Sequence, residues 1–158
     1  MGIPCSCGTE QRFDRAGDNN RYLRECVFGG AFGSLQSTAL RARHLVLRQG
    51  RQYLREISES GEPGSFGLPR RIGDRIRAVA PWSRLFDNRE ILLAINTDAD
   101  SKREAWVTID ARLHAEAEAL TCLYSTDAVQ LGATTSIGVC NGRAIRIAVP
   151  AGGFVAYG

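Results

Sequence analysis

The spacing of hydrophobic and polar positions changes character twice along this chain. Residues 1–33 are rich in glycine and charged side chains and follow no regular period, so we expect loops there. Residues 34–50 place apolar side chains three and four positions apart, which predicts a helix that Ser34 caps and Gly50 ends. Beyond residue 50 apolar and polar positions alternate, a pattern typical of β-strands.

The alternating part contains several strand-like segments. Residues 75–82 read as a half-buried strand in which Pro81 requires an edge or a bulge, because proline cannot donate a ladder hydrogen bond. Residues 90–96 are apolar on both faces, so we expect a central strand covered from two sides. Strands are also predicted over residues 105–109 and 120–124.

Two further local signals follow. The Ala- and Glu-rich residues 113–120 have the composition of a short helix. Asn141-Gly142 suits the positive φ angles of a type I′ turn and predicts a hairpin, whose second strand has core-facing side chains at Ile145, Ile147 and Val149. A last strand is predicted over residues 154–157, which brings the total to six to eight short strands. This number of strands predicts a mainly β fold, an antiparallel β-sandwich built as meanders or Greek keys. A loop-rich segment and one helix precede it.

Composition and charge argue against membrane proteins and nucleic-acid-binding proteins. The chain has 158 residues, of which 44% are apolar, enough for a core without disulfides or metals. No apolar run approaches the roughly 20 residues of a membrane span, and the first residues lack a signal-peptide pattern, so we expect a cytoplasmic protein without a membrane partner. Of the 20 basic residues 19 are arginine and the net charge is only +3, without a polybasic patch, so we expect no nucleic-acid partner.

The cysteines and histidines do not form a recognisable site. Five cysteines are an odd number without a regular framework, which indicates reduced thiols. Cys5 and Cys7 have Cys26 and His44 as their nearest further candidate ligands, but the spacing typical of zinc sites is missing, so no metal and no cofactor are expected. His44 and His114 both lie in segments predicted to be helical, where a surface or packing role is expected.

No catalytic motif is present. GxSxG, the Walker loop, GxGxxG before a helix and HExxH are all missing from the sequence. Glycosidic chemistry needs two carboxyl groups facing each other, and the acids here are scattered. Asp98 and Asp100 lie in a polar turn, where aspartate is favoured for its hydrogen bonds to nearby backbone. We therefore assign no catalytic residue.

Two stretches of the chain resemble a known family. The first comprises Gly2-Ile3-Pro4-Cys5, Gly8-Thr9-Glu10-Gln11 and the run from Arg21 to Gly33, and it is similar to the eighth barrel strand and following loop of bacterial alpha-amylase-type glycoside hydrolases (family 13). The second runs from Ile91-Leu92-Leu93-Ala94-Ile95-Asn96-Thr97 to the closing residues 149–158, and it resembles the C-terminal antiparallel β domain of those enzymes. Residues 45–54 resemble the end of the last barrel helix.

The resemblance implies two parts: residues 1–50 as a remnant of the last barrel strand, loop and helix, and residues 51–158 as the β-sandwich domain. The family's catalytic Asp, Glu and Asp would all lie upstream of Met1, so no catalytic residue transfers. We therefore expect a truncated, non-catalytic fragment with a structural or weak α-glucan-binding role. A lone barrel strand would expose its edges, so residues 1–33 should be disordered or repacked.

Aromatic side chains are the candidates for sugar binding. Trp106 is the stronger candidate because it lies opposite the apolar face of its strand. Trp82, which shares a face with Ile76, is a weaker candidate, as are Tyr124 and Tyr157. The alternative role is that of a subunit that completes an active hydrolase or transglycosylase with a separate barrel-bearing chain. A homodimer is a further expectation, since a surface that once met a barrel would be apolar.

Overall fold

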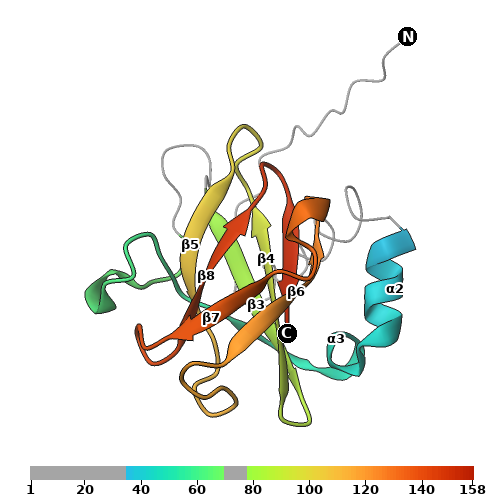
Figure 1. Cartoon of the computed structure of the whole chain (residues 1–158), viewed down its shortest axis with the longest axis horizontal. Helices are drawn as coiled ribbons and strands as arrows, with labels where there is room; N and C mark the ends of the chain where they lie inside the picture. The colour runs from blue at the N-terminus through green and yellow to red at the C-terminus, as the bar shows by residue number, and fades with distance from the viewer. Residues whose placement is uncertain (1–34, 70–77) are drawn as a thin grey trace, which may run out of the picture. The chain divides into compact units, whose positions relative to one another are not determined.

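The alternating segments form one antiparallel sheet in the computed structural model, which describes residues 35–69 and 78–158 (Figure 1). Residues Leu40–Gly158 form one compact unit. The strands are β1 (Arg51–Leu54), β2 (Ile57–Ser58), β3 (Val79–Phe86), β4 (Arg89–Asn96), β5 (Arg103–Thr108), β6 (Ala119–Ser125), β7 (Thr134–Gly138), β8 (Ala144–Val149) and β9 (Phe154–Tyr157). Their order is β1-β3-β4-β9-β6-β7-β8-β5-β2, with antiparallel neighbours throughout. The predicted mainly β, antiparallel fold class is confirmed.

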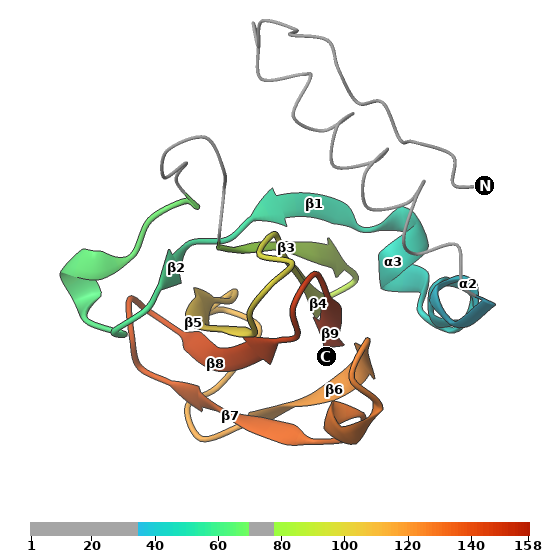
Figure 2. The same ribbon diagram turned by 90° about the horizontal axis from the view of Figure 1, so that it is seen from above.

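The two edges of this sheet are joined by one short segment of chain. β1 pairs with β3, and β2, which begins three residues after β1 ends, pairs with β5 at the other edge. Between them the Glu56 carbonyl accepts a hydrogen bond from the Thr108 N–H at 3.0 Å. Figure 2 shows β1 running on into β2 along one side of the curled sheet. The sheet therefore curls around its core and one segment bridges its edges.

Strand β4 is buried on both faces, as its sequence predicts. Leu92 and Ala94 lie in the main core, and Ile91 and Leu93 on the opposite face are also buried. Helix α3 (Leu45–Gln49) packs against β3 and β4. The main core combines side chains from both halves of the curled sheet: Val79, Leu92, Ala94, Ala105, Val107, Ile109, Leu120, Cys122, Ile137, Ile145, Ile147, Val149, Val155 and Tyr157.

The helix predicted over residues 34–50 is divided in two. Helix α2 (Leu35–Arg43) ends where His44 adopts an extended conformation (φ −115°, ψ 107°), and α3 begins at the next residue. The His44 N–H donates to the Leu40 carbonyl at 3.1 Å, and the His44 carbonyl accepts from the Leu47 N–H at 3.1 Å. His44 thus closes one helix and opens the next, and its expected place within a helix is wrong.

The helix predicted over residues 113–120 is also wrong. The segment forms turns up to Glu118, Ala117 has a positive φ of 67°, and β6 begins at Ala119. The Ala115 N–H donates to the Glu118 carboxylate at 3.0 Å instead of forming a helical bond. A segment of this length gains too little from helix formation to resist such local competition. The strand predicted over residues 120–124 is confirmed as part of β6.

The predicted hairpin at Asn141-Gly142 is confirmed with one change. Both residues have positive φ angles, 45° and 90°, as the turn chemistry requires. However, β7 ends at Gly138 and β8 starts at Ala144, so the loop comprises residues 139–143 and is longer than the two-residue turn expected. A true two-residue hairpin occurs instead at Asp87-Asn88, with φ angles of 50° and 56°, between Phe86 and Arg89.

The strand predicted over residues 75–82 is found as β3, which starts at Val79 and extends to Phe86; residues 75–77 lie outside the described residues. The Pro81 carbonyl accepts from the Arg55 N–H at 3.4 Å, while the β1–β3 pairing already ends at Trp82. The nitrogen of Pro81 points to the same side as its carbonyl, just beyond the last β1 pair. Strand β3 lies between β1 and β4, so the expected edge or bulge is not found, but Pro81 removes no ladder bond because the β1 pairing ends one residue earlier.

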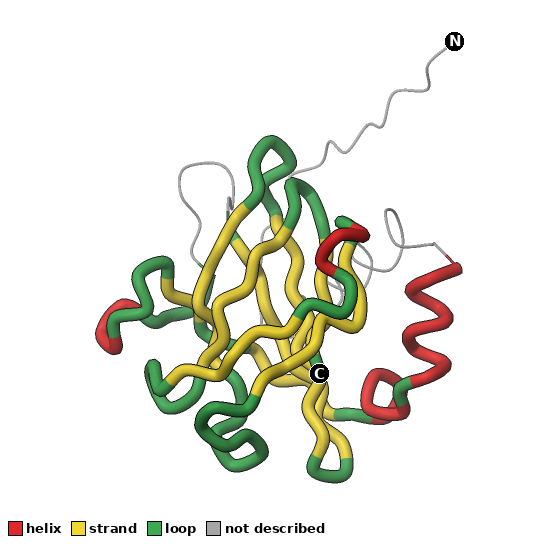
Figure 3. Tube along the Cα trace, viewed as in Figure 1, coloured by secondary structure: helices red, strands yellow, loops and turns green. Residues whose placement is uncertain are grey.

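The expectations for residues 1–33, including Cys5, Cys7 and Cys26, lie outside the described residues. Of the helices that the structure describes, none is both long and apolar enough to span a bilayer. Figure 3 shows how far strands dominate the described part of the chain.

Candidate functional site

A buried carboxylate at the start of β4 has four hydrogen-bonding partners from three other segments of the chain. The Glu90 side chain is fully buried. Its Oε1 accepts from the Arg55 guanidinium at 2.6 Å and from the Ser83 hydroxyl. Its Oε2 accepts from the Asp110 N–H at 2.8 Å and lies 3.1 Å from Nε2 of His114. Arg55 also donates from Nε to Ser83 at 2.8 Å, so the four partners form one connected network around Glu90.

The network keeps this carboxylate ionised. Burial by itself raises the pKa of Glu90, because a charge is poorly solvated in the interior. Hydrogen bonds from His114 and Ser83, the charge of Arg55 and the Asp110 N–H outweigh that effect, and the pKa of Glu90 lies below its usual value. The Glu90 charge is therefore compensated within the protein.

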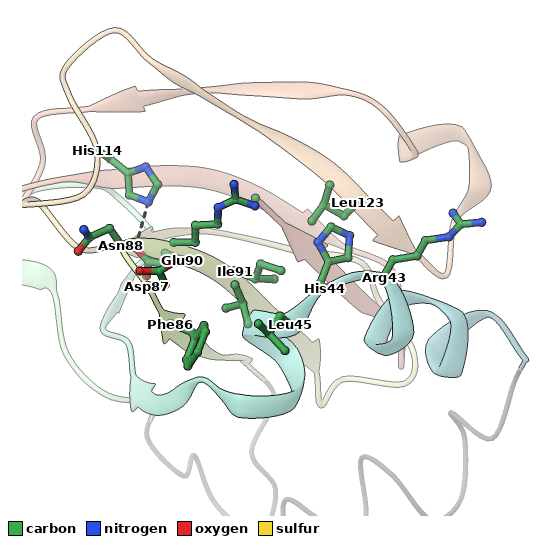
Figure 4. A pocket seen from close by; sticks show the side chains of 13 residues that line it. Arg43, His44, Leu45, Phe86, Asp87, Asn88, Glu90, Ile91, His114 and Leu123 are labelled. Carbon is green, nitrogen blue, oxygen red and sulfur yellow. Dashed lines mark hydrogen bonds and ion pairs between the residues drawn. The ribbon is translucent and has the colours of Figure 1, made fainter.

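A pocket of about 490 Å³ opens beside this network. Its walls come from α3, the β3–β4 hairpin, the segment around His114, β6 and the last residue. Figure 4 shows the His114 ring bonded to Glu90 at one end and His44 turned toward Leu123 nearer the other. The lining residues are Arg43, His44, Leu45, Val46, Phe86, Asp87, Asn88, Arg89, Glu90, Ile91, His114, Leu123 and Gly158.

Chemically, the buried Glu90 fixes the His114 ring and leaves its other nitrogen for a further hydrogen bond. The same carboxylate cannot act as an acid or a nucleophile while four groups hold it. Among the described residues no group of three or more His, Cys, Asp and Glu side chains is arranged to hold a metal ion. The arrangement is a pocket with one imidazole ring held by a buried carboxylate.

No sequence pattern predicts this network. Glu90, Arg55 and His114 are separated by 35 and 24 residues along the chain, so no motif links them. One signal was available: Glu90 is the charged residue that directly precedes the most apolar segment of the chain. A charged side chain at the start of a buried strand needs hydrogen-bonding or ionic partners, but the sequence alone does not show which residues these are.

The first predicted sugar-binding residue, Trp106, lies on the outward-facing side of β5 and is half-buried. It is opposite Arg146 on β8 and Ser58 on β2. Its indole is close to two glycines: a Cβ added to Gly61 would lie 2.7 Å from Nε1, and one added to Gly138 would lie 3.1 Å from Cζ3. The loop after β2 therefore packs on the indole, and only part of the ring is open to solvent.

Charged side chains lie beside Trp106 on the same face of the sheet. Glu104, two positions earlier on β5, accepts from Arg146 at 3.1 Å and pairs with Lys102 at 2.9 Å. The carboxylate of Glu104 is about half-exposed, and the hydrogen bond from Lys102, together with its charge, lowers the pKa of Glu104. Trp106 thus has exposed hydrogen-bonding groups next to it.

The second predicted residue, Trp82, is buried, with 5% of its surface exposed. Its ring centroid lies 6.1 Å from that of Phe154, which in turn lies 5.6 Å from that of Tyr124. The structure therefore groups Trp82 and Tyr124 in one aromatic cluster and places Trp106 on another part of the sheet. Tyr157 is buried in the main core.

The polar turn after β4 has the predicted role. Asp98 is buried and accepts from Arg103 at 2.6 Å, and its Oδ1 accepts from the Asp100 N–H at 3.0 Å. Asn96 accepts from the Asp98 N–H at 2.9 Å, so the turn is built from side chain to backbone bonds. Within the described residues Cys122 and Cys140 are free thiols.

The comparisons with known proteins find similarity among solved structures. A scan against protein-family models and a search of the curated proteins each return no match. Among solved structures, the chain is similar to a noncanonic maltogenic alpha-amylase, AmyB from Thermotoga neapolitana, with a TM-score of 0.45 and 15% sequence identity. The match covers 83% of this chain and 27% of that one, so this chain spans about a quarter of the amylase.

Proposed function

We propose that residues 51–158 are a non-catalytic β domain of the amylase type, with a structural or weak α-glucan-binding role. The observation that carries this proposal is the pairing of β4 with β9. The two stretches of the sequence that resemble the family's β domain, residues 91–97 and 149–158, contain these neighbouring strands, with Leu92 opposite Tyr157 and Ile95 opposite Phe154. The resemblance thus falls on two neighbouring strands whose residues are almost all buried.

The proposed α-glucan contact is at Trp106. Sugar rings stack on aromatic faces and edges while their hydroxyls take hydrogen bonds from nearby polar side chains. Trp106 combines a partly open indole with Arg146 and Glu104 on the same face. Trp82 would have to leave its aromatic cluster to reach a ligand. We expect a weak site, since one partly covered ring offers little contact area.

The proposal includes no hydrolysis by this chain alone. Retaining glycosidases need two carboxyl groups about 5–5.5 Å apart, one of which stays available as an acid. Glu90, the most buried glutamate described, has its oxygens taken by Arg55, Ser83, Asp110 and His114. Its role is structural, and the catalytic carboxylates implied by the family resemblance have no counterpart in this sequence.

Affinity electrophoresis tests the glucan contact. The purified chain is run in native gels with and without soluble starch, and migration is compared with that of a protein that does not bind starch. We expect starch to slow the chain, and Trp106→Ala to restore free migration. Arg146→Gln, which leaves the indole in place, should reduce the retardation partly. Equal migration of the wild type with and without starch would contradict the α-glucan contact.

A second candidate role is docking to a separate barrel-bearing chain. Exposed apolar side chains in α3 and in the first strand of the β domain favour it: Leu45, Tyr53 and Leu54 are 41%, 43% and 57% exposed. The test is to co-express this chain with a neighbouring reading frame that encodes barrel strands and to measure maltoheptaose hydrolysis. A complex that is active only with both chains, and is lost with Tyr53→Ser and Leu54→Ser, would support docking. Two chains that elute separately would exclude it.

A further inference from the structure

The loop that follows β2 is tied at its base and stands out from the sheet. The Ile57 N–H donates to the Gly67 carbonyl at 2.8 Å, and the Gly67 N–H donates to the Ile57 carbonyl at 3.0 Å. Residues 58–66 lie between these two, and we call them the serine loop. Figures 1 and 2 both show this loop, in green, projecting beyond β2. Its conformation can therefore change while its base stays attached to the sheet.

Hydroxyl groups hold the serine loop closed. The buried Ser58 hydroxyl accepts from the Gly61 N–H at 2.8 Å and is hydrogen-bonded to the Ser65 hydroxyl. The Ser65 hydroxyl donates to the Glu62 carbonyl at 2.6 Å, and the Ser60 hydroxyl lies 3.0 Å from it. Because Ser65 gives its one proton to a carbonyl, Ser58 is the donor in the bond between Ser58 and Ser65. Ser58 thus connects both halves of the loop.

The serine loop covers one end of the Trp106 indole. Ser58 is the direct cross-strand neighbour of Trp106 in the pairing of β2 with β5. A Cβ added to Gly61 would lie 2.7 Å from Nε1, 2.9 Å from Cδ1 and 3.2 Å from Cε2, which are all atoms of the five-membered ring. Gly138 approaches the six-membered ring at the other end of the indole. Gly61 therefore occupies space against the five-membered ring that a stacked sugar would need.

Little besides these bonds holds the loop against the indole. None of residues 59–67 is buried. Within the described ranges, every hydrogen bond of residues 59–66 runs to another residue of the serine loop. Gly64 and Gly67 have open space around their Cβ positions, so no neighbour confines the loop there. A segment that buries little apolar surface opens at a lower free energy than the core of the protein.

We infer that the serine loop is a lid over Trp106 and that the Ser58 hydroxyl is its latch. This inference rests on the proposed α-glucan contact and adds its regulation. When the lid is closed, Gly61 lies against the five-membered ring, and opening frees that ring for a stacked sugar. The apparent affinity for glucan is then the affinity of the open state reduced by the fraction of open molecules. Weakening the latch should therefore strengthen glucan binding.

Fluorescence quenching tests the lid without any glucan. Acrylamide quenches exposed indoles, and Trp82 is buried, so Trp106 supplies the accessible signal of the full chain. Trp106→Phe measures the part of the signal that belongs to Trp82. We expect Ser58→Ala and Ser65→Ala to increase the quenching of Trp106, because each removes a bond of the latch. Ser65 is exposed, so its variant keeps the test valid if Ser58→Ala folds poorly. The control is Ser101→Ala, an exposed serine in the turn after β4, which should leave the quenching unchanged.

Native gels with increasing amounts of starch test the regulation. Ser58→Ala and Ser65→Ala should bind starch more tightly than the wild type, by up to about fivefold, since the loss of one hydrogen bond shifts the open fraction by about that factor. Ser101→Ala should match the wild type, and circular dichroism checks that each variant is folded.

The inference is overturned if the latch variants leave the quenching of Trp106 unchanged. It is also overturned if they increase the quenching but bind starch no more tightly than a wild type that starch retards. If starch retards neither the wild type nor the latch variants while the quenching increases, the α-glucan contact is wrong and the lid over Trp106 is supported.

Discussion

The guanidinium of Arg55 lies 2.6 Å from the carboxylate of Glu90, although 35 residues separate them in the sequence. Arg55 belongs to the short segment that joins the two edges of the sheet, and Glu90 starts the strand that is buried on both faces. This ion pair therefore links the closing segment of the curled sheet to its most buried strand. Ser83 bridges both partners from the strand between them.

Removing the Glu90 charge should strongly destabilise the fold. Glu90→Gln leaves Arg55 with 14% of its side chain exposed and without its ionic partner, and removal of one member of a buried pair costs about 3 kcal/mol in free energy of unfolding. Urea denaturation measures the change. The control is Glu104→Gln, whose exposed ion pairs with Lys102 and Arg146 should contribute less than about 1 kcal/mol. Equal losses in the two variants would contradict the assigned role of Glu90.

The lowered pKa of Glu90 predicts how the folding stability changes at low pH. Because the pKa of Glu90 is lower in the folded protein than its ordinary value near 4.5, its contribution to stability is complete above that value. It should then be lost as the pH falls below about 4.5 and through the folded pKa. Urea midpoints between pH 3 and 7 should fall more steeply for the wild type than for Glu90→Gln. Parallel curves would show that Glu90 does not titrate as described.

The raised pKa of Tyr157 predicts how the folding stability changes at high pH. Burial raises the pKa of its phenol to about 12, and the neighbouring Cys122 thiol adds to the effect. Since the unfolded phenol ionises near pH 10, the folded protein should lose stability as the pH rises from about 10 to about 12. Absorbance at the phenolate band should show one tyrosine titrating late, and Tyr157→Phe should remove that phase. Simultaneous titration of all four tyrosines near pH 10 with the fold intact would contradict this prediction.

Gly61 predicts how tightly the loop after β2 holds Trp106. It has a φ of +82°, and an added Cβ would lie 2.7 Å from the indole Nε1, so Gly61→Ala adds a clash to the backbone strain. Gly132→Ala separates the two effects, because Gly132 has nearly the same φ of +80° and open space around its Cβ position.

We expect Gly132→Ala to cost about 1–2 kcal/mol in free energy of unfolding, the strain of a left-handed residue with a side chain. Gly61→Ala should cost more and should also shift the tryptophan fluorescence, which Gly132→Ala should leave unchanged. If the two variants lose the same stability with unchanged spectra, the loop does not pack on Trp106.

The parts of the fold that were predicted correctly depend on local patterns. The burial of β4 on both faces and the positive φ angles at Asn141-Gly142 follow from side chains that are adjacent in the sequence. The helix over residues 113–120 fails because local side chain to backbone bonds replace a short helix. The Asp87-Asn88 hairpin escaped prediction because neither residue is glycine, although both have positive φ.

The candidate site could not be predicted because its members meet only through the fold. Glu90, Arg55 and His114 lie on three different segments, and no spacing rule connects them. His44 faces the pocket only because the chain leaves the helical conformation at that residue. Trp82 and Trp106 each lie on a strand, and cross-strand partners decide that one is buried and the other partly open. The periodicity of apolar residues does not show which distant strands pair, and this pairing decides which side chains meet.

We propose above that residues 51–158 form a β domain that contacts α-glucan without cleaving it. The most direct measurement incubates the purified chain with maltoheptaose and analyses the products by chromatography, while the same preparation is run in starch-containing native gels. We expect retardation by starch, intact maltoheptaose, and free migration for Trp106→Ala. Hydrolysis that co-purifies with the chain would contradict the proposed function, and so would migration that starch leaves unchanged.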